Sequence, residues 1–380
     1  MAENKESKSV VNDNIEKIKT SLNNITTKES KFLFCVPESE NPSASVYEIY
    51  FHAKVVSDMG YKVIMLTEKS DYVVPNWIEK VLTDFDHKPM TDSKLTVSPE
   101  DIMIIPDIYS NVMEQTSELP CKRIGLLQSF DYMLSALIPG TDWSSFGIRD
   151  VIVTSESLKE NVELFYGKNK FNIMVYNLGI PDYFKKSDEP QKPIVSVVGR
   201  NPNEISKFVK LFYSKFPQYS WVTFDPMLTK SKPAKAMRRV DFANRLKNNF
   251  AAIWIDRIAS FGTFPVECMK SGVIPIGLKP DLIPEYLIER DEEGNGVKFV
   301  EGAGFWTENF YELPLLLGDV LVKFLDDGIK PELYNVMDEV ASKYTQESSK
   351  EELTNIYESV LNNRIKLFEN ALKDNDVENK

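Results

Sequence analysis

The stretch that decides the fold is Ser260-Phe-Gly-Thr-Phe-Pro-Val-Glu-Cys-Met-Lys-Ser-Gly-Val-Ile-Pro-Ile-Gly277. An apolar run, Phe250 to Ile255, precedes it and is typical of a buried strand. Gly262 predicts a loop, the residues around Glu267 predict a short helix, and Gly272 predicts its end, because glycine adopts the left-handed conformation at low cost. The apolar residues that follow predict a second strand. Strand, loop, helix and strand in this order are typical of a parallel sheet, whose ligands bind at the carboxyl ends of the strands.

The composition argues against several classes of protein. The 380 residues carry a net charge of −12, so the chain as a whole has no electrostatic attraction to nucleic acid or anionic membranes, although residues 230–245 form a local basic stretch. The three cysteines, Cys35, Cys121 and Cys268, are far apart, which predicts no disulfide framework and a cytoplasmic location. The two histidines are also far apart, so no metal site is expected. No apolar run has the length of a transmembrane segment.

The first half of the chain has the pattern of a parallel sheet. Apolar runs that predict buried strands alternate with helical segments, and one of these helices ends at Gly60 directly before a strand. The predicted strands are 31–36, 61–66, 101–106, 122–127, 151–154 and 171–176. Residues 177–182 break this pattern, and a polar stretch follows them.

A second half restarts with the apolar run Ile194 to Val198, so the sequence predicts two α/β domains. Residues 1–30 are a polar leader, which is either a weakly amphipathic helix or a mobile tail. We expect the domains to span 31–182 and 183–344, and we expect a closing helix over 345–380 to pack back toward the first domain. Two α/β halves joined by a short connector form a cleft, where small charged metabolites bind.

Two loops of the second half carry candidate binding residues. Arg200 follows the strand at 194–198, where a guanidinium could bind phosphate through two hydrogen bonds, and Lys207 could add a second charge. The loop from Ser260 leads into the helix of Glu267, whose N-terminal N–H groups suit an anion and whose carboxylate suits ribose hydroxyls. Together these features predict a site for a nucleoside diphosphate. Taken singly, Arg200 could be a surface arginine in a turn, and Glu267 a glutamate favoured by the helix dipole.

Other nucleotide-binding classes fit less well. Neither loop has a Walker sequence, and no GxGxxG follows the first strand. A kinase and a dinucleotide-dependent dehydrogenase are therefore disfavoured.

From about Lys31 to the closing helix, the chain resembles the GT-B glycosyltransferases, and among them the retaining family 4. In that family the second domain opens with a strand that ends in Gly-Arg, with a lysine a few residues on, as in Gly199-Arg200 and Lys207. A later motif continues from Phe-Gly through a glutamate to a Gly stop and a Val/Pro strand. The segment Phe261 to Pro275 is similar to it, and Glu267 has the family's spacing from the glycine.

This resemblance implies an α/β fold of GT-B architecture, with two Rossmann-like parallel-sheet domains facing a cleft. It implies that a sugar moves from a nucleotide sugar, such as a UDP- or GDP-sugar, to an acceptor hydroxyl, with retention of configuration and without a metal or other cofactor. In the family, the basic residues of the first motif hold the donor diphosphate and the glutamate holds the ribose. These roles pass to Arg200, Lys207 and Glu267.

Some positions depart from the family pattern. The first glutamate of the later motif is Ala259 here, and Asp256, three residues earlier, is a candidate substitute for the missing sugar-contacting carboxylate. The neighbouring Arg257 is a further candidate for phosphate binding. In the first domain, residues 41–44 replace a Gly-Gly pair, and residues 128–131 occupy the place where many members have a histidine.

The predicted site residues fall into three sets, and none is a metal ligand. The catalytic candidates are Asp256, Glu267 and Asp131. The donor-binding candidates, of which residues 261–264 are expected to shape the sugar pocket, are Arg200, Lys207, Arg257, Ser260, Phe261, Gly262, Thr263, Phe264 and Glu267. The acceptor-side candidates are Ser43, Gln128 and Asp131.

Residues 98–131 also resemble divergent family 4 members found in phage genomes. That resemblance implies an acceptor that is a glycan or a modified nucleobase in DNA, and the host cytoplasm as the location. Two alternatives stay open. Ala259 is compatible with an inactive GT-B relative that serves as a binding or scaffold subunit, and other GT-B enzymes are epimerases or phosphorylases. The sequence names neither the sugar, nor the base, nor the acceptor.

Overall fold

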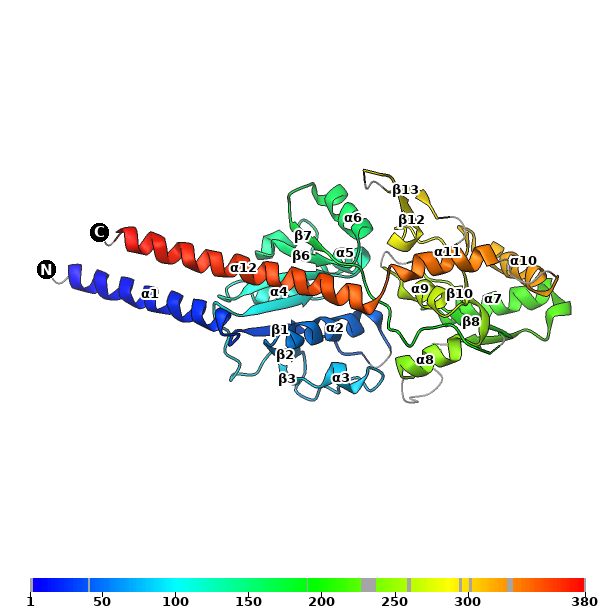
Figure 1. Cartoon of the computed structure of the whole chain (residues 1–380), viewed down its shortest axis with the longest axis horizontal. Helices are drawn as coiled ribbons and strands as arrows, with labels where there is room; N and C mark the ends of the chain where they lie inside the picture. The colour runs from blue at the N-terminus through cyan, green and yellow to red at the C-terminus, as the bar shows by residue number, and fades with distance from the viewer. Residues whose placement is uncertain are drawn as a thin grey trace.

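The computed structural model describes residues 3–39, 42–189, 191–226, 237–257, 261–293, 296–300, 303–326 and 331–378. Figure 1 shows two α/β units side by side, with both chain termini at the same end of the molecule. Helices α1 (Glu3–Thr26) and α12 (Gln346–Glu378) lie against each other and extend beyond the first unit (Figure 1).

The first unit contains a seven-stranded parallel sheet with the strand order β3-β2-β1-β4-β5-β6-β7. Alternate residues of β1 enter two separate hydrophobic clusters, Phe32 and Phe34 in one and Leu33 and Cys35 in the other, so both faces of the sheet are covered. The strands are β1 (Lys31–Cys35), β2 (Lys62–Thr67), β3 (Asp86–Pro89), β4 (Ile102–Pro106), β5 (Lys122–Leu127), β6 (Asp150–Val153) and β7 (Asn172–Val175). The α-helices are α2 (Ala44–Asp58), α3 (Lys80–Thr83), α4 (Ser110–Gln115), α5 (Phe130–Ala136) and α6 (Glu156–Tyr166).

The second unit contains a five-stranded parallel sheet with the order β14-β11-β10-β8-β9, and a separate antiparallel pair, β12 with β13. Its strands are β8 (Lys192–Val198), β9 (Thr223–Pro226), β10 (Asn249–Trp254), β11 (Ile274–Leu278), β12 (Ile288–Arg290), β13 (Gly296–Phe299) and β14 (Phe305–Thr307). Its α-helices are α7 (Pro202–Lys215), α8 (Arg239–Leu246), α9 (Thr263–Lys270), α10 (Leu313–Asp326) and α11 (Pro331–Ser342). The predicted fold class, two α/β units with parallel sheets, is confirmed.

Each sheet has a point where the strand order reverses. In the first unit the chain builds β1, β2 and β3 in one direction and returns with β4 to the other side of β1. In the second unit it builds β8 and β9, and returns with β10 to the other side of β8. Ligands of open parallel sheets bind just beyond the carboxyl ends of the strands at this reversal. The residues after β8 and β10 are therefore the first place to look for a site.

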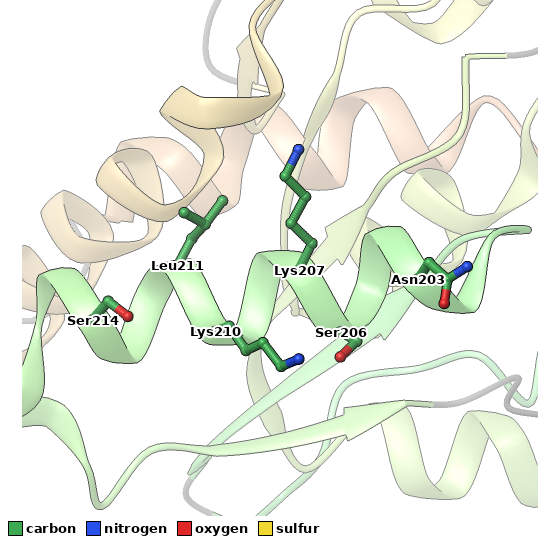
Figure 2. Close-up of a pocket in the computed structure, with 6 residues that line it drawn as sticks. All are labelled: Asn203, Ser206, Lys207, Lys210, Leu211 and Ser214. Atoms are coloured by element: carbon green, nitrogen blue, oxygen red, sulfur yellow. The ribbon is translucent and has the colours of Figure 1, made fainter.

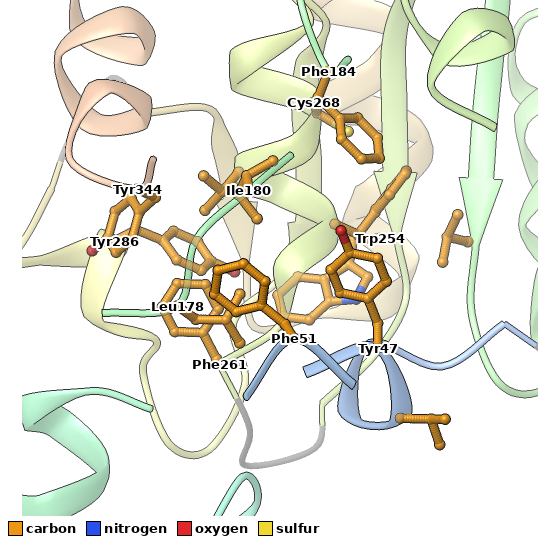
Figure 3. Close-up of a cluster of buried hydrophobic side chains, with 14 of the residues drawn as sticks. Tyr47, Phe51, Leu178, Ile180, Phe184, Trp254, Phe261, Cys268, Tyr286 and Tyr344 are labelled. Atoms are coloured by element: carbon orange, nitrogen blue, oxygen red, sulfur yellow. The ribbon is translucent and has the colours of Figure 1, made fainter. Parts of the chain in front are cut away.

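One hydrophobic cluster continues from the first unit into the second, across what we call the domain seam, the contact of α2 with the segments around α8 and α9. Figure 3 shows Tyr47 and Phe51 of α2 gathered with side chains of the second unit, among them Phe261 and Tyr286. The ring of Phe261 lies 5.5 Å from that of Tyr286 and 5.3 Å from that of Tyr344. The seam is thus apolar over much of its area, and the polar groups buried in it need partners.

Four short strands, β3, β12, β13 and β14, were not predicted from the sequence. β3 reads Asp-His-Lys-Pro and β12 reads Ile-Glu-Arg, so neither has the apolar run that identifies a buried strand. β3 and β14 lie at sheet edges, where one side of the strand needs no partner.

Candidate functional site

The loops after β8 and β10 meet at the strand-order reversal of the second sheet. Arg200 stands two residues beyond the end of β8, and Asp256 stands two residues beyond the end of β10. The Arg200 Nε lies 2.9 Å from the Asp256 Oδ2. The structure therefore brings together the residue predicted to hold the donor phosphates and the residue proposed as a substitute carboxylate.

Arg200 also reaches the first unit. Its Nη1 donates a hydrogen bond of 2.5 Å to the Tyr132 hydroxyl on α5, and its guanidinium lies 5.4 Å from the centre of the Tyr132 ring. The Arg200 side chain is 46% exposed, so solvent screens its ion pair with Asp256. An arginine in this position is available to an incoming anion, which would have to share it with Asp256.

Glu267 is held differently. It lies in the second turn of α9, is almost fully buried, and accepts a hydrogen bond of 2.7 Å from the Arg239 Nη2. The two side chains are only 7% and 9% exposed. The glutamate predicted to bind ribose is thus one half of a buried ion pair.

Arg239 connects this pair to the first unit. Its guanidinium lies 4.0 Å from the centre of the Tyr47 ring on α2, and its backbone N–H donates to the carbonyl oxygen of Trp77 at 3.1 Å. Burial alone would lower the pKa of Arg239, but Glu267 and the neighbouring tyrosines, Tyr183 and Tyr47, raise it above its ordinary value. The guanidinium is therefore a permanent buried cation at the domain seam.

A second buried carboxylate, that of Glu48 on α2, lies within the electrostatic range of Arg239. Its Oε2 accepts a hydrogen bond of 3.3 Å from the Tyr176 hydroxyl, and its Oε1 has no hydrogen-bond partner among the described residues. Burial raises the pKa of Glu48 to about 8, although the attraction of Arg239 and the bond from Tyr176 lower it.

Lys207 does not join the other donor candidates. Its Nζ donates to the Tyr311 hydroxyl at 2.7 Å and lies 4.4 Å from the centre of that ring and 5.2 Å from that of Phe310. Figure 2 shows it on α7, whose residues line a surface hollow. The volume of this hollow is about 400 Å³. The described contacts of Lys207 are therefore with the segment after β14.

Residues 261–264 have mainly structural contacts. Phe261 and Phe264 are buried in the hydrophobic cluster of the seam, rather than forming an open sugar pocket. Gly262, at φ +65°, caps α9, and its carbonyl oxygen accepts a hydrogen bond of 2.9 Å from the Tyr286 hydroxyl. A Cβ at this position would lie 2.8 Å from the Trp254 ring. Thr263 is the first residue of α9 and is half-buried.

Three further positions belong to the predicted donor loop. Ser260 and Ala259 lie outside the described residues. Arg257, directly after Asp256, is exposed. Because Pro265 has no N–H, the first turn of α9 offers an anion the amides of Thr263 and Phe264 but not a third.

The acceptor-side candidates lie at the carboxyl edge of the first sheet. The Ser43 hydroxyl caps α2 by accepting a hydrogen bond of 3.4 Å from the N–H of Val46. Asp131 is exposed in the first turn of α5, next to the Tyr132 that contacts Arg200. Of these candidates, Asp131 thus stands beside a contact between the two units.

Gln128 is buried in a network that ties β5 to α2. Its side-chain Nε2 donates to the carbonyl oxygen of Ser45 at 3.0 Å, and its backbone N–H donates to the Asp107 Oδ2 at 2.9 Å. The N–H of Ser129 donates to the same Asp107 oxygen at 2.7 Å. Burial raises the pKa of Asp107 to about 7, against the lowering effect of these N–H groups. Asp107 was not predicted, and it follows β4 at the strand-order reversal of the first sheet.

Arg239 and Tyr47 are the other residues that the sequence analysis missed. A usable signal existed for Arg239, because it shares a helical stripe with Ala243 and Leu246, and all three are buried. Arg238 lies on the exposed face of the same helix and pairs with Asp241 at 2.7 Å. For Tyr47 the sequence offered only an aromatic residue in an apolar helix.

The described residues contain no group of three or more His, Cys, Asp or Glu side chains that could hold a metal ion. Within the same residues, no helix combines the length and the apolar character needed to cross a membrane. The three cysteines are free and buried.

Comparison with known proteins relates the fold, though not the sequence, to glycosyltransferases. No protein-family model and no curated protein match the chain. It is similar to the structure of the pneumococcal O-GlcNAc transferase GtfA in complex with UDP and GlcNAc, with TM-score 0.59 and 9% identity over 88% of this chain and 99% of that chain. It is similar to a glycosyltransferase from Rickettsia africae ESF-5, with TM-score 0.56 and 14% identity over 89% of this chain and 99% of that chain.

A further match shows that this likeness extends to the fold alone. The N-terminal domain of trehalose-6-phosphate phosphatase from Candida albicans has TM-score 0.56 and 10% identity over 88% of this chain and 97% of that chain. Against a chain of a GtfA/B complex, this chain spans 58% of that chain's length, with TM-score 0.48. Identities this low relate folds and not reactions. The chain has the GT-B glycosyltransferase fold, built from two Rossmann-like α/β domains.

Proposed function

We propose that this protein is a glycosyltransferase that moves a sugar from a nucleoside-diphosphate sugar to an acceptor hydroxyl, with retention of configuration and without a metal. One observation carries the proposal. Arg200 follows the carboxyl end of β8, and α9 is the next helix after the carboxyl end of β10; these two strands lie on either side of the order reversal in the second sheet. A basic residue and a helix N-terminus at that point form the kind of site that binds phosphate groups.

The roles follow from the position of each group. Arg200 and the N–H groups of Thr263 and Phe264 bind the donor diphosphate and stabilise the charge that develops as it leaves. Glu267 accepts hydrogen bonds from the ribose hydroxyls. Lys207 takes part only if its ammonium leaves Tyr311, which accepts its hydrogen bond at 2.7 Å.

Two other carboxylates have candidate roles on either side of the reacting sugar. Asp256, already paired with Arg200, takes the place of the sugar-contacting glutamate that Ala259 lacks. Asp131, on the acceptor side and next to Tyr132, receives the proton that the acceptor hydroxyl loses as the new glycosidic bond forms. The acceptor is a glycan or a modified nucleobase.

The test is calorimetric binding of UDP and GDP to the wild type and to Arg200→Ala. We expect the variant to lose about tenfold or more in affinity, since it removes charge-assisted hydrogen bonds to phosphate. Lys210→Ala is the matched control, because Lys210 is an exposed cation of α7 in the hollow along that helix. Equal affinity for the nucleotide in the wild type and in Arg200→Ala would contradict the proposal that Arg200 binds the donor diphosphate.

Turnover and stereochemistry need their own measurements. The release of UDP or GDP from a panel of sugar nucleotides, with and without a chelator, tests transfer and metal independence together. Proton NMR of the product distinguishes retention from inversion at the anomeric carbon.

A second candidate function is a GT-B protein that binds a nucleotide or sugar without transferring it. Ala259 favours it, because the carboxylate that contacts the sugar in the resembling family is missing at that position. Nucleotide binding without release of nucleoside diphosphate from any sugar nucleotide, in the presence of candidate acceptors, would support this candidate over the enzyme.

A further inference from the structure

We propose that Arg239 is a positioning residue for the donor: it holds the Glu267 carboxylate toward the ribose, and the Tyr47 ring of the first domain holds Arg239. The inference rests on the proposed function, because it assumes that Glu267 binds the nucleotide. It adds a consequence that the proposed function alone does not contain. Nucleotide affinity depends on an aromatic residue of the opposite domain.

The geometry of the pair supports this role. The Arg239 Nη2 lies 2.7 Å from the Glu267 Oε1, which fixes one oxygen of the carboxylate and with it the orientation of the side chain. Both side chains are at least nine-tenths buried. A buried carboxylate in a nucleotide site needs such a cation, because an unpaired buried charge is strongly disfavoured.

Arg239 has few other polar partners. Its Nη1 is buried and has no hydrogen-bond partner among the described residues. The guanidinium also lies against the face of Tyr47, 4.0 Å away, and near the ring of Phe184 at 5.7 Å. Glu48 and Tyr183 lie within its electrostatic range. Tyr47 is itself anchored, because its hydroxyl accepts a hydrogen bond of 2.9 Å from the Gln346 Nε2 at the start of α12. The chain of contacts therefore runs from α12 through α2 and α8 to α9.

The adjacent arginine supplies a matched control. Arg238 has a 64% exposed side chain and pairs with Asp241 of its own helix, at 2.7 Å. Arg238→Gln and Arg239→Gln are thus the same chemical change at neighbouring positions, one outside and one inside the seam.

The experiment is a double-mutant cycle of nucleotide binding at Arg239 and Glu267. We use UDP or GDP, whichever the wild type binds more tightly, and measure affinity by calorimetry on variants that circular dichroism shows to be folded. We expect Glu267→Gln and Arg239→Gln each to lose about tenfold in affinity and the double variant to lose no more than either. We expect Arg239→Lys to recover part of the loss and Arg238→Gln to bind as the wild type does.

Tyr47 tests the link to the other domain. Tyr47→Leu removes the aromatic face and should lose about fivefold in affinity. Tyr47→Phe keeps the face but loses the hydroxyl that Gln346 binds, so its loss should be smaller than that of Tyr47→Leu. A purely structural role for Tyr47 would lower the melting temperature of Tyr47→Leu without changing the affinity of the folded protein.

The outcomes separate this inference from the proposed function. If Glu267→Gln binds the nucleotide as tightly as the wild type, Glu267 is not a nucleotide ligand, and both claims about it fall. If Glu267→Gln loses affinity but Arg239→Gln and Tyr47→Leu bind normally, the proposed function stands and the positioning role is wrong. Losses at Arg239 and Glu267 that simply add would also overturn it, because a positioning residue acts through the group that it positions.

Discussion

Two arginine–carboxylate pairs stand at the candidate site, and they differ in burial. Arg200 and Asp256 are joined at 2.9 Å with the arginine side chain 46% exposed, whereas Arg239 and Glu267 are joined at 2.7 Å with both side chains at least nine-tenths buried. An exposed pair contributes little to stability and leaves its arginine available to a ligand. A buried pair cannot lose one partner without leaving an uncompensated charge. The same chemistry therefore suggests a binding group in one place and a positioning device in the other.

The largest effect is expected from breaking the buried pair. Glu267→Ala leaves the Arg239 guanidinium buried without its carboxylate, so we expect the free energy of unfolding to fall by about 3–5 kcal/mol. Urea unfolding followed by circular dichroism measures this loss. A loss no larger than that of Asp256→Ala in the same assay would contradict the distinction between the two pairs.

The next largest effect on stability is expected at Gly262, which caps α9, the helix that carries Glu267. Gly262→Ala forces a side chain into a left-handed conformation, with its Cβ 2.8 Å from the Trp254 ring, so we expect a loss of stability of about 2 kcal/mol. Gly140→Ala is the control, since Gly140 also has positive φ but nothing lies within 4 Å of its Cβ position. Equal losses in the two variants would show that the Trp254 contact is unimportant.

A third prediction concerns the pH dependence of the protein's stability, to which the buried Glu48 contributes. Burial raises the pKa of Glu48 from 4.5 to about 8. Between pH 4.5 and about 8, the Glu48 carboxyl is therefore protonated in the folded state and ionised in the unfolded state. Stability from this group is complete below pH 4.5 and is lost as the pH rises through 8. Glu48→Gln should flatten this slope and stabilise the protein at pH 9 by on the order of 2 kcal/mol relative to the wild type.

Urea titrations at a series of pH values measure this slope. His52→Gln is the control, because burial lowers the pKa of His52 to about 3, so its contribution is lost only as the pH falls below 6.5. We therefore expect His52→Gln to change the free energy of unfolding at acid pH, below 6.5, and not at alkaline pH. An unchanged alkaline slope in Glu48→Gln would show that Glu48 does not hold the proton.

The smallest effect is expected at the exposed pair. Asp256→Asn should change the free energy of unfolding by less than about 1 kcal/mol, because solvent already screens Arg200. The difference between wild type and variant should shrink further in about 0.5 M salt, as screened interactions do. A loss as large as that of Glu267→Ala, or one that salt does not alter, would place Asp256 in the same class as Glu267.

Much of the fold was predictable because it depends on short-range patterns. The apolar run from Phe250, the glycines at 262 and 272 and the next apolar run predicted β10, α9 and β11 in the right order. Gly60 likewise predicted the end of α2 directly before β2. These signals need only the residues within one or two turns of the chain. β3 was missed because an edge strand need not be apolar, and β14, which reads Phe-Trp-Thr, was missed because three residues are too few to show a strand pattern.

The site was predictable in part. Arg200 was predicted from its place after a strand, and the structure puts it beside the strand-order reversal of the second sheet. Glu267 lies in the second turn of α9 and pairs with Arg239, and the binding roles of both residues stay predictions. Lys207 was grouped with them because it is near Arg200 in sequence, but on the helix its ammonium turns to Tyr311. Phe261 and Phe264 were assigned to a sugar pocket, but they are buried in the seam. The position of a residue in the sequence predicts the helix, strand or loop that carries it. It predicts the direction of the side chain less reliably.

By itself, the sequence determined the two α/β units, their parallel sheets and the loops that follow their strands, since strand and helix periodicity and glycine positions are local properties. Only the tertiary structure decided which carboxylates and cations meet. Arg238 and Arg239 are adjacent residues of the same type. Arg238 pairs with Asp241 on α8, whereas Arg239 pairs with Glu267 and lies against the ring of Tyr47. The physical reason is that a charged side chain needs a partner when it is buried and hardly needs one at the surface. Burial depends on packing between segments that are far apart in the chain.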